Sequence, residues 1–175
     1  MYVMLSFASH PLGRNMDAHA ISSDLMNAML SRLPERERRS LAEALARGAE
    51  AKEALLRWAG GAWTVDEVAA HLGISRQAVN KRRIAGTLLA VEAGDCLLYP
   101  RFQFTEDGVL EGLPAVLQAI DTESGWMKVQ VLFTYTLRTS PERAEEPPET
   151  ILEALQRGRT EDAVHAARSW GTQGA

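Results

Sequence analysis

The chain has 175 residues, enough for one full domain or for two to three small ones. Ala, Leu, Arg and Glu dominate its composition, which favours helix over sheet, so we expect a mainly α protein. No stretch approaches the roughly 20 apolar residues that a membrane-spanning helix needs, and we therefore expect no membrane partner.

The net charge of -4 is unevenly divided along the chain. Residues 1–62 hold eight basic and seven acidic side chains, residues 63–104 hold five and four, and residues 105–175 hold six and twelve. Segment 74–86 has no carboxylate and four basic side chains: Arg76, Lys81, Arg82 and Arg83. A local positive segment is typical of surfaces that contact phosphates, so the acidic total does not exclude nucleic acid as a partner.

A cytoplasmic protein is expected from the cysteine content and from the start of the chain. The single cysteine, Cys96, cannot form an internal disulfide and gives no sign of an oxidising compartment. The first eight residues are apolar but lack the basic start of a secretory signal, and His10 and Pro11 follow before an apolar segment of useful length.

Residues 1–62 are predicted to form a helical dimerisation region. Apolar residues recur at helical spacing on both sides of Pro34: Ile21, Leu25, Met29 and Leu33 before it, and Leu41, Leu45, Leu55 and Trp58 after it. The second set predicts a long amphipathic helix that ends at Gly60 and Gly61. A small neighbouring domain cannot cover so long a stripe, which favours pairing of two copies; packing within one chain is the alternative.

The next elements carry the signals of a helix-turn-helix over residues 64–84. Thr64 and Glu67 have the spacing of a capping box, which starts a helix. Gly73 supplies a left-handed residue for a tight turn, and Ser75 can cap a second helix. The inward side chains are small or aliphatic: Val65, Val68, Ala69 and Leu72 on the first helix, and Ala78 and Val79 on the second.

A β-hairpin is expected directly after this helix pair. Two short apolar runs, residues 88–91 and 96–99, flank the sequence Glu-Ala-Gly-Asp, in which Gly94 stands where a turn needs positive φ. A helix pair followed by a hairpin is a winged arrangement. Residues 63–104 are therefore predicted to form a winged helix-turn-helix domain with a small β-hairpin.

Residues 105–175 are predicted to form a C-terminal helical domain that binds a partner. A Pro- and Glu-rich connector is expected at residues 140–148. Helices are expected at 114–120, 151–156 and 160–170. Residues 126–137 alternate as a strand would and fit one helical face equally well, so periodicity leaves both structures open.

The outward side chains of the second motif helix suit reading of the major groove. Gln and Asn can bond N6 and N7 of adenine, and Arg can bond O6 and N7 of guanine, so Arg76, Gln77 and Asn80 are expected to contact bases. Three more side chains are expected to contact phosphates: Ser75, Lys81 and Arg83. Arg82 stands at a position that is commonly apolar, and its stem is expected to lie across the domain.

Residues 67–79 and 86–91, which read EVAAHLGISRQAV and GTLLAV, resemble the excisionase and MerR-like winged helix-turn-helix families. The resemblance implies double-stranded operator DNA as a partner. It does not separate repressors, activators and recombination factors, because this fold serves all of them.

A second resemblance lies in the acidic section. Residues 126–137, the connector, residues 148–158 (PETILEALQRG) and residues 161–170 look like the Xre/MbcA/ParS toxin-binding domain of bacterial antitoxins. In that family the segment matching 126–137 is helical, so the resemblance implies a helix there. It also implies binding of a cognate toxin of the RES type, which degrades NAD. The side chains expected to bind this partner are Leu155, Arg157, Arg159 and Trp170.

No metal, cofactor or catalytic site is predicted. The histidines and the cysteine lack the spacing of a zinc site: His10, His19, His71, His165 and Cys96. A phosphate contact is an alternative for His71, which lies on the first motif helix. The sequence has no nucleophile elbow, phosphate-binding glycine loop or zinc-protease motif, and we expect no enzymatic activity.

These predictions together describe a nucleoid-associated homodimer that binds a roughly palindromic operator, represses its own operon and neutralises a toxin. Two alternatives stay open. One is a regulator or excision factor without a toxin partner, and the other is an interaction adaptor whose winged fold no longer contacts DNA.

Overall fold

A computed structural model describes residue 28, residues 30–137 and residues 147–172. Several residues used above lie outside the described residues: Ile21, Leu25, Met29, His10, His19 and positions 140–146 of the connector. The chain divides into two units, residues 1–48 and 49–175. Within the described ranges, no helix combines the length and the apolar character needed to cross a membrane.

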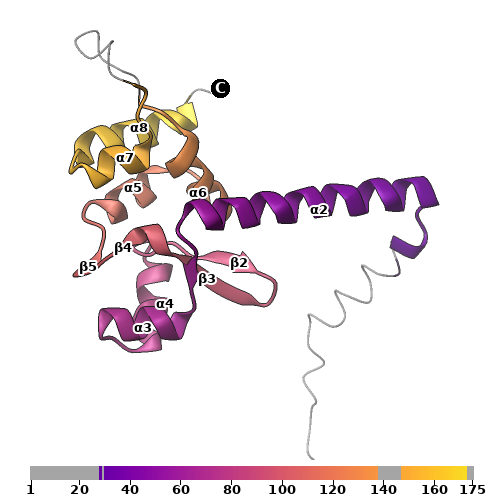
Figure 1. Ribbon diagram of the computed structural model, residues 1–175, viewed down its shortest axis with the longest axis horizontal. Coiled ribbons are helices and arrows are strands. Elements are labelled where there is room, and N and C mark those ends of the chain that lie inside the picture. Colours follow the sequence, from indigo (N-terminus) through magenta and orange to yellow (C-terminus); the bar gives the residue numbers. More distant parts are fainter. Residues whose placement is uncertain (1–27, 29, 138–146, 173–175) are drawn as a thin grey trace, which may run out of the picture. The chain divides into compact units, whose positions relative to one another are not determined.

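The architecture is mainly helical with small antiparallel sheets, which confirms the predicted fold class (Figure 1). The first part contains α2 (Glu35–Trp58), β1 (Ala62–Trp63), α3 (Val65–Leu72), α4 (Arg76–Ile84), β2 (Val91–Ala93) and β3 (Cys96–Pro100). The second part contains the 3-10 helix η1 (Arg101–Gln103), β4 (Phe104–Thr105), β5 (Gly108–Val109), α5 (Leu113–Ala119), α6 (Gly125–Thr134), α7 (Ile151–Gln156) and α8 (Thr160–Thr172).

The long helix α2 is present as predicted and ends close to the predicted glycines. It begins directly after Pro34, and its end at Trp58 is followed by two glycines with positive φ, Gly60 and Gly61. None of its residues is buried. Of the four side chains predicted for dimerisation, Leu55 packs against the core of its own chain, whereas the other three are exposed: Leu41, Leu45 and Trp58.

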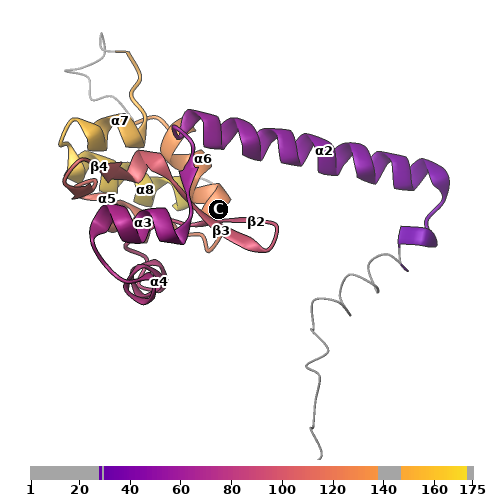
Figure 2. The same ribbon diagram turned by 60° about the horizontal axis from the view of Figure 1, so that its bottom comes forward.

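The helix-turn-helix forms from the local signals that predicted it. The backbone N–H of Thr64 donates to Glu67 Oε2 at 2.7 Å, and Thr64 Oγ1 accepts from the backbone N–H of Glu67, which completes the capping box. Gly73 adopts φ 62°, and Ser75 Oγ accepts from the backbone N–H of Ala78 at 3.2 Å. Figure 2 shows α4 almost along its axis and α3 from the side, so the two helices cross steeply.

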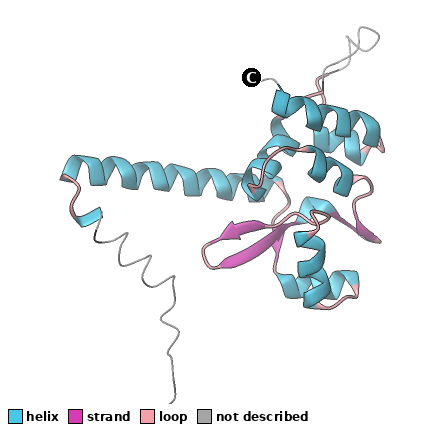
Figure 3. Ribbon diagram, turned by 180° about the vertical axis from the view of Figure 1, so that it is seen from behind, coloured by secondary structure: helices cyan, strands magenta, loops and turns pink. Residues whose placement is uncertain are grey.

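The strands combine a predicted hairpin with pairings that the sequence did not reveal. β2 and β3 form the expected hairpin, with Gly94 at φ 60° in its turn. β1 adds a third strand, because Ala62 pairs with Pro100 and Trp63 with Tyr99, and β4 pairs with β5 in a second sheet. Figure 3 shows these strands between the helix pair and the C-terminal helices. Strands of two residues carry no periodicity that sequence analysis can use.

Residues 88–100, which contain the β2–β3 hairpin, are called the wing here. Two apolar cores meet at the wing. One lies under the helix pair and is made by Val68, Val79, Leu88 and Tyr99. The other joins α5 to α8 with Leu89 and Val91 of the wing. The neighbouring residues Leu88 and Leu89 thus belong to different cores. The predicted domain boundaries at 62/63 and 104/105 both fall inside strands of the unit 49–175, β1 and β4.

The structure resolves the ambiguity at residues 126–137 in favour of a helix. α6 covers Gly125–Thr134, with Ser124 Oγ accepting from the backbone N–H of Met127. It ends three residues before the predicted end, because Thr136 forms a β-bridge with Thr150. The helices predicted at 151–156 and 160–170 are present as α7 and α8, and α8 packs against both α7 and α5.

Two capping boxes should make the stability of the protein depend on pH. Hydrogen bonds from Thr64 lower the pKa of Glu67, and hydrogen bonds from Thr150 lower the pKa of Glu153, below the ordinary value of 4.5. Because the folded-state pKa is lowered, the stabilisation is present above the ordinary value and is lost as pH falls through the folded-state pKa. We expect the natural chain to lose more stability between about pH 6 and about pH 3 than a Glu67→Gln, Glu153→Gln variant, since Gln caps without titrating. Urea unfolding at both pH values measures the two losses, and equal losses would contradict the prediction.

Candidate nucleic-acid interface

Helix α4 presents one face to the protein and the other to solvent. Val79 is fully buried in the core under the helix pair and Ala78 is half-buried. The helical repeat places Gln77 and Asn80 on the opposite face, and both are exposed. Because only one face of α4 packs against the protein, the exposed face can enter a groove while the core under the helix pair stays intact.

The structure brings all six predicted DNA-contacting residues together on α4 and its N-cap. Five of them are exposed: Ser75, Arg76, Gln77, Asn80 and Lys81. Arg83 is half-buried. Arg82 is exposed, and the course of its stem across the domain stays a prediction.

Arg76 is held by an acidic side chain at the start of α3. Its Nε lies 3.1 Å from Asp66 Oδ1, and both side chains are about two-thirds exposed. An ion pair this exposed typically contributes less than about 1 kcal/mol. Arg76 can therefore leave Asp66 and bind a guanine with little loss of free energy. In the free protein, Arg76 offsets the negative charge of the Asp66 carboxylate beside α4.

Asn80 is oriented by Arg83. Arg83 Nε donates to Asn80 Oδ1 at 3.0 Å. A carbonyl oxygen has two lone pairs, so Asn80 Oδ1 can still accept from N6 of adenine while the Asn80 amide donates to N7. The charge of Arg83 also acts on Tyr99, where it partly opposes the rise in the pKa of Tyr99 caused by burial. Arg83 thus positions the amide of Asn80 in addition to carrying charge.

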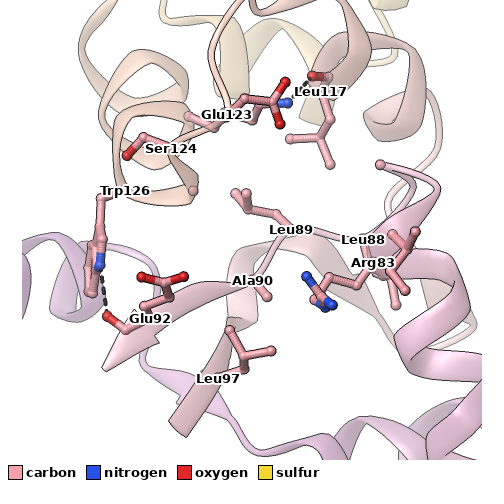
Figure 4. A pocket seen from close by; sticks show the side chains of 14 residues that line it. Arg83, Leu88, Leu89, Ala90, Glu92, Leu97, Leu117, Glu123, Ser124 and Trp126 are labelled. Carbon is pink, nitrogen blue, oxygen red and sulfur yellow. Dashed lines mark hydrogen bonds between the residues drawn. The ribbon is translucent and has the colours of Figure 1, made fainter. Parts of the chain in front are cut away.

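A cavity of about 680 Å³ opens beside Arg83, between α4, the wing and the N-terminus of α6. Figure 4 shows Arg83 and Leu97 pointing into it and Trp126 at its far side. The indole Nε1 of Trp126 donates to the backbone oxygen of Glu92 at 2.9 Å, which ties α6 to the wing. Lys128 Nζ donates to Leu117 O at 2.7 Å, and burial lowers the pKa of Lys128.

The wing itself carries no basic side chain. Residues 88–100 contain Glu92 and Asp95 and no Lys or Arg. Proteins that enter the minor groove use cationic or amide side chains there. The Lys and Arg side chains of the helix-turn-helix and wing, residues 64–100, therefore all lie on α4.

His71 makes contacts within its own chain. Its Nε2 lies 2.9 Å from Thr105 O, to which it donates, and its ring contacts Trp63 and Phe104 at centroid distances of 4.8 Å and 5.7 Å. Arg101 stacks over Trp63, with its guanidinium carbon 5.1 Å from the centre of the indole ring. These contacts hold His71 within the chain and speak against the phosphate contact considered for it.

Sequence analysis missed Gln103, the fully buried residue that fixes the base of the wing. Its Oε1 accepts from Leu89 N at 2.9 Å, and its Nε2 donates to Leu89 O at 2.8 Å and to Pro100 O at 2.9 Å. A lone Gln between Phe102 and Phe104 gives no local sign of such a role. Its partners lie in segments whose approach depends on the complete fold.

Gln103→Met is expected to lower the free energy of unfolding by about 2 kcal/mol. Met fills similar space but leaves the buried N–H and C=O of Leu89 without these partners, and a buried unsatisfied group costs about 1–3 kcal/mol. Urea unfolding measures the change. Gln118→Met is the matched control, because Gln118 is exposed and the same substitution there should have almost no effect.

The predicted partner-binding residues of the C-terminal helices have mixed environments. Leu155 is 2 % exposed and belongs to the core, so its assignment to a partner surface was wrong. Trp170 packs partly against the same core. Arg157 Nη1 lies 2.8 Å from Glu149 Oε1, and Arg159 also pairs with Glu149. The apolar residues of a short helix have the same spacing whether they pack in the core or form a docking surface, so the sequence alone could not place Leu155.

Cys96 and His165 are both exposed. Among the described residues, no group of three or more His, Cys, Asp or Glu side chains is arranged to hold a metal ion.

Comparison with known proteins gives no family. No family model matches the sequence, and no curated protein matches it. The NMR structure of Rv2175c is similar in fold, with a TM-score of 0.49 and 20% sequence identity over 62% of this chain and 80% of that chain.

Proposed function

We propose that the protein is a transcriptional regulator that binds double-stranded DNA by placing α4 in the major groove. The exposed face of α4 carries this proposal, because it combines amide and cationic side chains without a carboxylate. The major groove is about 12 Å wide and admits an α-helix. The nine residues of α4 extend about 13 Å, which suits a short recognition helix.

Each side chain of this face has a chemical role in the proposal. Gln77 and Asn80 bond adenine, and Arg76 bonds guanine. Lys81 and the N-cap Ser75 contact phosphates, which fixes the register of the helix on the duplex. In this scheme Arg83 holds the Asn80 amide and adds positive charge at the groove edge.

Selection of duplexes from a random pool by the full-length chain tests the proposed function. We expect enrichment of one motif with two half-sites in inverted orientation, because a twofold dimer imposes its symmetry on its site. An Arg76→Ala, Asn80→Ala variant should enrich nothing similar. If the natural chain enriches no motif, the proposal fails and the adaptor hypothesis is favoured.

Dimerisation through α2 is part of the proposal. Leu41 and Leu45 lie one turn apart and are exposed, and no side chain of α2 is buried within its chain. Pairing with α2 of a second copy would remove this apolar surface from water. Two copies would also present two α4 helices to one duplex.

Leu41→Glu, Leu45→Glu is expected to convert a dimer into a monomer and to weaken DNA binding at least tenfold, because each half-site then binds alone. Sedimentation equilibrium and fluorescence anisotropy measure the two effects. Glu43→Lys, on the opposite face of the same helix, is the control that should stay dimeric. A natural chain that sediments as a monomer would refute the dimer.

Neutralisation of a toxin is a second candidate function. It is favoured by one observation: residues 125–134 are helical despite their alternating pattern, as the antitoxin resemblance requires. We propose co-expression with the product of the adjacent gene as the test. Co-purification at a fixed ratio supports an antitoxin that represses its own operon, and repeated failure supports a regulator without a toxin.

A further inference from the structure

Ile84, the last residue of α4, is an apolar side chain on an otherwise polar reading face. It is 70 % exposed. Gln77, Asn80 and Ile84 are separated by three and four residues, so they share one face of the helix. The face opposite the buried Val79 thus ends in an aliphatic group.

Neither core explains the presence of Ile84. It belongs to neither of the two apolar clusters of the unit 49–175. It lies at the rim of the cavity described above, which Leu97 of the wing also lines. Leu97 is 37 % exposed and lies on β3, not on α4. It therefore serves as the control for Ile84: an apolar residue at the same cavity rim but outside the exposed face of α4.

The major groove offers one apolar group on its base edges. Adenine, guanine and cytosine present donors and acceptors there, whereas thymine also presents its C5-methyl group. An aliphatic side chain can satisfy none of the donors and acceptors, but it can pack on a methyl group. Ile is β-branched and stiff at χ1, so it loses little freedom in making such a contact.

We propose that Ile84 packs on the C5-methyl group of a thymine and thereby fixes one base of each half-site. This inference rests on the proposed DNA-binding function. Four residues of helix separate Ile84 from Asn80, a distance of about 6 Å along the axis. Base pairs are spaced by about 3.4 Å, so the thymine is expected about two steps from the adenine that Asn80 reads.

Deoxyuridine substitution tests this contact, because it removes the methyl group and leaves every hydrogen-bonding atom of the base in place. Each thymine of the selected duplex is replaced in turn, and anisotropy measures the affinity of the full-length chain. We expect about a fourfold loss at one thymine per half-site, which is the effect of one methyl-sized contact, and little change at the others. A duplex with 5-methylcytosine at that position should bind more tightly, by a similar factor, than a duplex with cytosine there.

Variants assign the effect to Ile84. Ile84→Ala should bind thymine and deoxyuridine duplexes equally, whereas Leu97→Ala should keep the natural preference. The high exposure of Ile84 means that its variant should melt at the same temperature as the natural chain. If Ile84 instead serves the cavity rim, Ile84→Ala lowers the melting temperature and no thymine shows a methyl effect, which overturns the inference.

The test also separates this inference from the proposed function. A selected duplex that binds equally well with every thymine replaced refutes the role of Ile84 and leaves DNA binding intact. Failure to select any duplex refutes the proposed function itself and, with it, this inference.

Discussion

Gly125→Ala is expected to lower the free energy of unfolding by about 3 kcal/mol, the upper part of the usual range for overpacking a well-packed interior. A Cβ at Gly125 would lie 2.1 Å from Ala90 O and 3.5 Å from Val91 Cα. Both are backbone atoms next to or within β2, so no side chain can rotate out of the way. α6 would have to move off the wing, which would also strain the bond from Trp126 to Glu92 O.

Thermal and urea unfolding measure this effect. For a chain of this size, about 3 kcal/mol corresponds to a fall of roughly 6–12 °C in melting temperature. Gly48→Ala is the matched control, because a Cβ there meets nothing within 4 Å and alanine is the better helix former by about 1 kcal/mol. The two glycines should respond with opposite signs. A Gly125→Ala variant as stable as the natural chain would contradict the packing of α6 against β2.

Gln77→Ala, Asn80→Ala is expected to remove most of the preference for the selected duplex over random DNA. Each bidentate contact with a base contributes about 1–3 kcal/mol of discrimination, so the double variant should lose at least thirtyfold in specific affinity. Both side chains are exposed, and the fold should be unchanged. Binding to random duplex should change little, because phosphate contacts supply it.

Lys81→Ala provides the contrasting control in the same anisotropy assay. Loss of a phosphate contact should weaken binding to selected and random duplexes alike and make the salt dependence shallower by about one unit per protomer. If Gln77→Ala, Asn80→Ala lowers both affinities equally, these side chains do not read bases.

The helix-turn-helix could be predicted because its signals are local. Thr64 and Glu67 are three residues apart, and Gly73 and Ser75 stand at the ends of the helices that they terminate or cap. Such interactions depend on a few neighbouring residues and hardly on the remaining fold. The sequence therefore predicted both motif helices, the turn between them and the outward face of α4.

Long-range features could not be predicted in the same way. β1 exists because Trp63 meets Tyr99, and Gln103 is buried because Leu89 and Pro100 converge on its amide. Side-chain pairs show the same limit: the sequence indicated that Asn80 points outward, but not that Arg83 holds its oxygen.

The most direct test of α4 in the groove is equilibrium binding of the full-length chain to its selected duplex over a range of salt concentrations. If about three phosphates are neutralised by each protomer of a dimer, the slope of log affinity against log salt should be near -5. A slope near zero, or no binding to any duplex, would contradict the insertion of this helix into DNA.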